Sequence, residues 1–231
     1  MRIALVQNHG VEDADLVAAV LQARGVACLT VNSFRDEPMP GVGDFDAVVV
    51  FGSPASCTEL DRYPRLLRVR DLVAECVSHG RPVLGICFGG QLLAQVLGAE
   101  VRKNDLPEVG CFDVRLTAEG RRSPWFAGFP DVFPTAQWHY DRFGIPPGAE
   151  WLASSERCPH QAFSLGPHVG LQLHLEASQR KVQDWLSRYH GSLPDAGKPP
   201  EELSADFART AAERERLCDL FMVNFLRAVN G

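Results

Sequence analysis

The chain has 231 residues, a net charge of −6 and 45% hydrophobic residues. It is therefore long enough to bury a sizeable core, and its acidic balance argues against nucleic-acid binding. No apolar stretch approaches the roughly 20 residues of a membrane-spanning helix, and the N-terminus lacks a cleavable signal pattern, so we expect no membrane contact. The seven cysteines show neither Cys-x-x-Cys pairs nor metal-ligand spacing, which favours the reducing cytoplasm and predicts neither a metal nor another cofactor.

The first part of the chain alternates between strand-like and helix-like patterns. We expect strands over residues 2–7, 26–31, 45–51 and 82–86, and helices over residues 13–24, 65–78 and 89–97. Strands that alternate with helices predict an α/β fold in which helices flank a mostly parallel central sheet.

The pattern changes in the middle of the chain. Residues 110–117 alternate between the two faces of a strand, which predicts an antiparallel strand, and further strands are expected over residues 132–138, 151–155, 161–165 and 169–176. The rest reads as a helix over 180–189, a loop over 191–200 and a long helical stretch over 200–230, with one break left open.

The apolar stripe from Leu217 to Leu226 in this last stretch needs burial. We therefore expect a main domain over residues 1–177 and a C-terminal helical extension over residues 178–231 that packs on it. A surface for a partner protein is the alternative use of the stripe.

A candidate nucleophile lies between the strand expected at 82–86 and the helix expected at 89–97. The sequence Gly85-Ile86-Cys87-Phe88-Gly89 has the Gly-x-nucleophile-x-Gly pattern of a sharp strand-to-helix turn. Glycines suit such a turn because its backbone is strained and its neighbours pass close by. Cys87 would lie at a helix N-terminus, where the backbone dipoles favour the thiolate.

A candidate base and its orienting acid come at the end of the strand expected over 169–176. On a strand, residues two apart point to the same face, so Glu176 can hold one ring nitrogen of His174 while the other faces a nucleophile. Together with Cys87, these residues make a triad of the kind that activates nucleophiles for acyl transfer.

At this point the motifs resemble those of the class I glutamine amidotransferases. That family has a Gly-x-Cys-x-Gly-x-Gln elbow, a Gly-Gly-Pro or Gly-Ser-Pro turn after an early strand, and a Gly-Gln-x-His-Pro-Glu block. The order of the three blocks also agrees, over roughly residues 1–177. The matches are Gly85, Cys87, Gly89 and Gln91 in the elbow, residues 52–54 in the turn, and residues 171–176, more loosely, in the last block.

One position departs from the family pattern. Leu175 stands where the family has proline between the histidine and the glutamate, which removes a restraint on the backbone before Glu176. Stand-alone members similar to γ-glutamyl peptidases often have leucine there, which points to that branch of the family. The resemblance also implies that the fold is flavodoxin-like.

The resemblance implies roles for further residues. The amide after the nucleophile, that of Phe88, would be one oxyanion donor, and the turn at Gly52 would supply the second. Gln91 and Ser56 would contact the substrate. His139, in the Trp-His-Tyr-Asp segment 138–141, is either a residue of the pocket wall that contacts the substrate or a structural histidine.

The implied function is hydrolysis of the side-chain amide of glutamine, or of another γ-glutamyl amide, through a thioester on Cys87. A γ-glutamyl peptidase with the same triad is the alternative, and the triad does not separate the two. A non-catalytic redox sensor on the same scaffold is a third reading, although a sensor thiol needs neither His174 nor Glu176. The partner is a small γ-glutamyl compound, and a separate enzyme that accepts the ammonia is left open.

Overall fold

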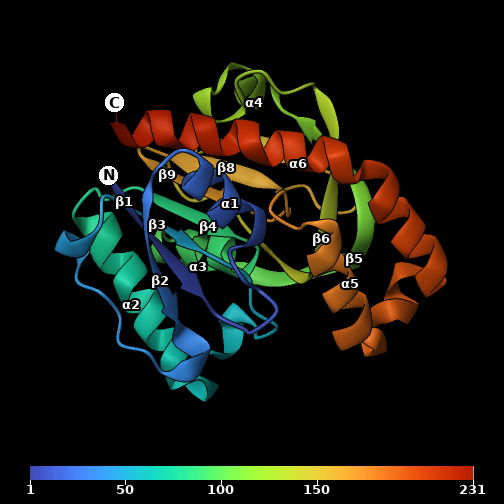
Figure 1. The fold of residues 1–231 in the computed structure, drawn as a ribbon, viewed down its shortest axis with the longest axis horizontal. Coiled ribbons are helices and arrows are strands. Elements are labelled where there is room, and N and C mark those ends of the chain that lie inside the picture. Colours follow the sequence, from blue (N-terminus) through green and yellow to red (C-terminus); the bar gives the residue numbers. More distant parts are fainter. Residues whose placement is uncertain (231) are drawn as a thin grey trace.

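The computed structural model describes residues 1–230, and its helices and strands alternate as the sequence predicts through the first part of the chain (Figure 1). Short 3-10 helices lie at Ser33–Arg35, Val42–Asp44, Cys57–Arg62, Pro124–Phe126 and His190–Ala196. The strands are β1 (Arg2–Gln7), β2 (Ala27–Asn32), β3 (Ala47–Val50), β4 (Val83–Ile86), β5 (Val101–Leu116), β6 (Val132–Phe143), β7 (Glu150–Ser154), β8 (Ala162–Leu165) and β9 (His168–Leu171). The α-helices are α1 (Asp15–Ala23), α2 (Pro64–Ser78), α3 (Phe88–Val96), α4 (Ala118–Arg122), α5 (Gln179–Arg188) and α6 (Pro200–Asn230).

Within the described residues the strands form one nine-stranded sheet in the order β2-β1-β3-β4-β9-β8-β7-β5-β6. The strands β2, β1, β3, β4 and β9 pair in parallel. From β9 onward the pairs are antiparallel, and β5 and β6 make the longest pairing. The sheet thus confirms the predicted α/β class, with a parallel part that carries the early strands and an antiparallel part built from the middle of the chain.

Alternating side chains of the parallel strands enter two hydrophobic layers. Ile3 and Leu5 of β1 belong to the layer that includes residues of α1 and α6, whereas Ala4 and Val6 belong to the layer that includes residues of α2 and α3. All residues of β3 and β4 are buried, because parallel strands covered on both faces have no solvent side. This burial fixes the ends of β3 and β4, where the candidate site lies.

Two expectations about the elements need correction. The strand predicted over 169–176 ends at Leu171, because the chain then leaves its place between β4 and β8, and His174 pairs with Ala136 of β6. The stretch over 200–230 is helical as predicted, and the break that the sequence left open is absent, because one α-helix runs from Pro200 to Asn230. The loop predicted over 191–200 also contains a 3-10 helix that ends at Ala196.

The C-terminal helix α6 runs along the molecule beside α1 (Figure 1). Its residues Leu217, Phe221 and Phe225 share a hydrophobic cluster with Ile86 and Leu171 of the central strands. Burial of these large side chains stabilises α6 in place by about 1.5–3 kcal/mol for each residue. The division between residues 177 and 178 remains a prediction, and Gly231, at the end of the predicted extension, lies outside the described residues.

Candidate active site

Cys87 occupies a sharp turn between the end of β4 and the start of α3. Its φ of 51° and ψ of −110° lie outside the regions that L-residues ordinarily adopt, which is typical of a strained nucleophile turn. A Cβ atom on Gly85 would lie 2.3 Å from the Gly89 carbonyl oxygen, and one on Gly89 would lie 2.0 Å from that of Val50. The predicted strand, turn and helix are therefore present, and both glycines are required by close backbone contacts.

Hydrogen bonds with neighbouring residues fix the position of Cys87, and its environment favours a reactive sulfur. Its backbone amide donates a hydrogen bond to the Leu171 carbonyl oxygen over 2.7 Å, which ties the turn to β9. The side-chain amide of Gln172 donates to the Cys87 sulfur over 3.7 Å. The side chain is only 7% exposed, and the N-terminus of α3 adds backbone dipoles that favour a thiolate.

His174 lies after the end of β9 and is held from two sides. Its backbone exchanges hydrogen bonds of 2.9 and 3.2 Å with Ala136 of β6. Its Nδ1 lies 2.6 Å from Oε1 of Glu176, and the edge of its ring contacts Trp185 at 4.9 Å between centroids. The contact between His174 and Glu176 is present as predicted, but an isolated bridge and a bend produce it in place of a continuous strand.

Burial and charge act in opposite directions on this pair. Burial opposes the charged imidazolium, but the Glu176 carboxylate and Cys87 outweigh that penalty and hold the pKa of His174 well above its usual value. Burial also opposes the charged carboxylate of Glu176, and its pKa is nevertheless lowered, mainly by His174. The pair therefore favours an imidazolium next to a carboxylate, which suits a histidine that takes a proton from a thiol.

Lys181, from α5, brings a buried positive charge to the same carboxylate. Its Nζ lies 4.0 Å from Oε1 of Glu176 and donates a hydrogen bond to the Asp13 carbonyl oxygen over 2.5 Å. Sequence reasoning did not select Lys181, because a lysine in an amphipathic helix ordinarily faces solvent. Its ammonium helps to keep Glu176 ionised in a buried site.

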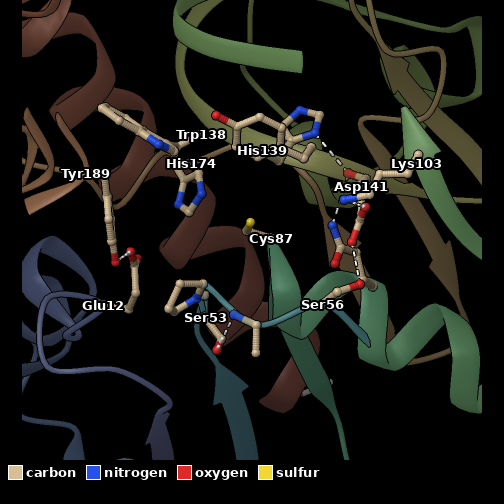
Figure 2. A pocket seen from close by; sticks show the side chains of 15 residues that line it. Glu12, Ser53, Ser56, Cys87, Lys103, Trp138, His139, Asp141, His174 and Tyr189 are labelled. Atoms are coloured by element: carbon tan, nitrogen blue, oxygen red, sulfur yellow. Dashed lines mark hydrogen bonds and ion pairs between the residues drawn. The ribbon is translucent and has the colours of Figure 1, made fainter. Parts of the chain in front are cut away.

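Cys87 and His174 face a common cavity of about 230 Å³ (Figure 2). Gly52, two residues after the end of β3, lies at its wall, and a Cβ atom there would be 3.6 Å from Cε1 of His174. The three elements that end at this edge thus bring Gly52, Cys87 and His174 together, as expected for a sheet whose sites lie beyond the carboxyl ends of its strands. The oxyanion roles of Gly52 and Phe88 remain predictions.

One end of the cavity carries a pair of opposite charges. Lys103 of β5 lies 3.1 Å from Asp141 of β6, and Ser56 donates a hydrogen bond to the other Asp141 oxygen over 2.6 Å. Gln91 of α3 also lines the cavity, and its amide donates to the Asp141 carbonyl oxygen over 3.1 Å. Lys103 was not selected from the sequence, because it lies in a strand far from the recognised motifs.

His139 also borders the cavity, but both of its ring nitrogens are already engaged. Nδ1 faces the Asp141 carbonyl oxygen at 3.0 Å, and Nε2 faces the buried Glu108 carboxylate at 2.8 Å. Ser155 and Gln161 also donate to Glu108. The His139 ring thus contacts the backbone of Asp141 and the side chain of Glu108, so both ring nitrogens are directed at protein acceptors. Its predicted contact with substrate remains untested.

The other end of the cavity contains residues that the sequence motifs did not reveal. Glu12 follows β1, and Tyr189 follows α5; the Tyr189 hydroxyl donates to Oε1 of Glu12 over 3.2 Å. The position of Glu12 beyond the carboxyl end of a parallel strand is a signal that would have selected it. Tyr189 carries no such signal.

None of the helices in residues 1–230 combines the length and apolar composition needed to cross a membrane. The sequence profile described as "Glutamine amidotransferase class-I" matches residues 13–188. The chain is 32% identical over 201 residues to a putative glutamine amidotransferase-like protein, YfeJ, of Salmonella typhimurium, covering 85% of this chain and 84% of that protein.

Two further comparisons agree with this match. A glutamine-hydrolyzing GMP synthase of Thermomicrobium roseum is 33% identical over 185 residues, which are 80% of this chain and only 33% of that enzyme. The crystal structure of a glutamine amidotransferase from Thermotoga maritima superposes with a TM-score of 0.90 at 27% identity, covering 100% of this chain and 99% of that one.

Proposed function

Since this chain belongs to the glutamine amidotransferase class-I family, we propose that it hydrolyses the side-chain amide of glutamine, or of a related γ-glutamyl compound, through a thioester on Cys87. The observation that carries this proposal is the placement of Cys87 on a strained turn, in the same cavity as a His174 that is held by Glu176.

The first half of the reaction forms the thioester. The Cys87 sulfur attacks the γ-carbonyl carbon, and the carbonyl oxygen becomes an oxyanion that amides at Phe88 and Gly52 would stabilise. His174, having taken the thiol proton, gives it to the amide nitrogen as the carbon–nitrogen bond breaks. The amine leaves, and the glutamyl group stays on sulfur.

The second half returns the enzyme to its starting state. A water molecule enters the place that the amine has left and attacks the thioester carbon while His174 takes its proton. The carbon–sulfur bond then breaks, which releases glutamate and restores the Cys87 sulfur. Glu176 orients His174 and stabilises its charged form through both halves.

The cavity end at Lys103 and Asp141 supports binding of the glutamyl head. A γ-glutamyl group carries one carboxylate and one ammonium on its α-carbon, which are complementary to this lysine and this aspartate. Ser56 and Gln91, which contact Asp141, would fix its orientation. This placement brings the γ-carbonyl toward Cys87.

A γ-glutamyl peptidase is the second form of this activity, and one observation favours it. The cavity continues past Cys87 to Glu12 and Tyr189. Glutamine would leave this part of the cavity empty, because its amide nitrogen carries no substituent. A separate enzyme that takes up the released ammonia is the partner expected for the glutaminase form. The free cysteines suit a reducing cytoplasm in either case.

Steady-state assays of the purified chain on glutamine and on γ-glutamyl dipeptides test the proposal. Glutamate release by the wild type and loss of release in Cys87→Ala are expected. Glutamine as the better substrate would favour the amidotransferase form, and dipeptides as the better substrates would favour the peptidase. No turnover on any of these compounds would contradict activity of the isolated chain.

A further inference from the structure

The cavity extends on both sides of Cys87. Figure 2 shows Asp141 and Lys103 on one side of the sulfur and Glu12 with Tyr189 on the other. With the glutamyl head at Lys103 and Asp141 and the γ-carbonyl at Cys87, a substituent on the amide nitrogen extends toward Glu12. This end of the cavity therefore faces the leaving amine.

At this end of the cavity, the carboxyl group of Glu12 has one oxygen that accepts no hydrogen bond from the described residues. Its side chain is only 6% exposed, and Tyr189 donates to Oε1. Among residues 1–230 the buried Oε2 has no hydrogen-bond partner. A buried carboxyl oxygen without a partner costs free energy, so its position on a cavity wall points to a ligand that donates hydrogen bonds.

The positive charges around Glu12 do not fully compensate for the burial of its carboxylate. Burial raises the pKa of Glu12, and the nearby charges of Lys181 and His174 lower it only in part. The Lys181 ammonium is already bound to the Asp13 carbonyl oxygen. A cation that entered the cavity would supply the stabilisation that the ionised Glu12 carboxylate lacks.

Aromatic rings complete this end of the cavity. Trp138 and Tyr189 both line it, and their ring centroids lie 5.8 Å apart at an interplanar angle of 52°. Aromatic faces attract cations, and they also cover the methylene groups that join two amines. A carboxylate beside two aromatic rings is the chemistry that recognises an alkylammonium group.

We propose that Glu12, Tyr189 and Trp138 form a leaving-group subsite for a positively charged amine, so that the preferred substrates are γ-glutamyl amides of diamines. This inference rests on the proposed hydrolysis at Cys87. It adds the chemical class of the leaving group, which the triad does not specify. Glutamine, whose amide nitrogen carries no substituent, leaves the subsite empty.

Two arginines close enough to His9 to affect its charge, Arg65 and Arg188, favour a negatively charged leaving group. Burial lowers the pKa of His9, which lies 3.2 Å from the Tyr189 hydroxyl, and Arg188 and Arg65 lower it further. A leaving group with a carboxylate would be attracted to these arginines and repelled by Glu12. A comparison of leaving groups that differ only in charge therefore decides between the two.

The experiment compares kcat/KM for the γ-glutamyl amides of ethylenediamine, propylamine and β-alanine. The first two have nearly the same size, and only the first carries a cation. We expect the ethylenediamine amide to be preferred over the propylamine amide by about ten- to a hundredfold, as for a hydrogen bond to a charged group. Equal rates for these two, or a preference for the β-alanine amide, would overturn the subsite.

Variants link the preference to Glu12. In Glu12→Gln the ratio of kcat/KM for the ethylenediamine amide to that for the propylamine amide should fall to near one. In Tyr189→Phe this ratio should fall by a smaller factor. Glu201→Gln, an exposed change at the start of α6, is the matched control and should keep the wild-type preference. A preference that survives Glu12→Gln would contradict the role of this carboxylate.

A binding measurement separates this inference from the proposed function. In Cys87→Ala, calorimetry should show tighter binding of the ethylenediamine amide than of the propylamine amide, by a factor similar to that in kcat/KM. If the wild type hydrolyses none of the amides, the proposed function fails, and this comparison still decides the subsite. Equal affinities would overturn the inference even if glutamine is hydrolysed.

Discussion

The side-chain amide of Gln172 donates a hydrogen bond to the Cys87 sulfur over 3.7 Å, while its carbonyl oxygen accepts one from Gln91 over 3.1 Å. All three residues are buried, so water competes little for these contacts. A donor directed at sulfur favours the thiolate over the thiol. Gln172 therefore belongs to the groups that prepare the nucleophile, although it holds no proton that the reaction transfers.

Replacing Gln172 with leucine removes this donor and nearly preserves the volume. We expect Cys87 to react with iodoacetamide about tenfold more slowly at neutral pH, because hydrogen bonds to charged groups contribute about 1.5–3 kcal/mol. Gln22→Leu, on the exposed face of α1, is the control and should react at the wild-type rate. An unchanged rate in Gln172→Leu would show that the sulfur does not depend on this amide.

The triad residues should contribute unequally. His174→Ala should lower kcat/KM by about a thousandfold or more, since His174 transfers protons. Glu176→Gln should cost roughly ten- to three hundredfold, about 1.4–3.4 kcal/mol, since Glu176 only orients and stabilises the imidazole. Full activity in Glu176→Gln would indicate that replacement of the family proline by Leu175 has made this carboxylate dispensable.

The pH profile gives a second test of the same pair. Burial opposes the imidazolium, and Glu176 with Cys87 raises the pKa of His174 well above its usual value despite that burial. Without the carboxylate, the pKa of His174 should fall, and the imidazolium needed to protonate the leaving amine should be lost at lower pH. The alkaline limb of kcat/KM should therefore move to lower pH in Glu176→Gln, and an unmoved limb would contradict the coupling.

The need for glycine at position 89 can be tested by measuring the free energy of unfolding. In Gly89→Ala the new methyl group would lie 2.0 Å from the Val50 carbonyl oxygen, so α3 must move away from the sheet. We expect the free energy of unfolding in urea to fall by about 1–3 kcal/mol or more. Gly43→Ala, where no atom lies within 4 Å of the added Cβ, should change it by less than about 0.5 kcal/mol.

Much of the fold was predictable because local patterns determine it. The apolar runs of β1, β3 and β4 and the glycines around Cys87 indicate buried strands and a strand-to-helix turn without reference to the rest of the chain. The end of β9 was not predictable, because Leu173 and Leu175 are as apolar as a strand requires. Only the partner of that segment, Ala136 on β6, shows that it leaves the place of β9 between β4 and β8.

The same distinction separates the predicted site from the missed residues. Cys87, His174 and Glu176 lie in short motifs whose spacing carries their chemistry. Glu12 and Tyr189 are 177 residues apart in the sequence, and only the packing of α5 beside the first loop brings them to one cavity. Apart from the position of Glu12 after β1, nonlocal contacts of this kind leave no pattern in a single sequence.

The central claim is that Cys87 carries the γ-glutamyl group during turnover. The direct measurement is mass spectrometry of the acid-quenched protein after brief mixing with glutamine or a γ-glutamyl amide, followed by peptide mapping. We predict the mass gain of one γ-glutamyl group on the peptide that contains Cys87, and its absence in Cys87→Ala. The thiols of Cys57 and Cys111, whose pKa values burial raises, should stay unmodified. Glutamate release that continues in Cys87→Ala, or an adduct on Cys57 or Cys111 in its place, would contradict the account.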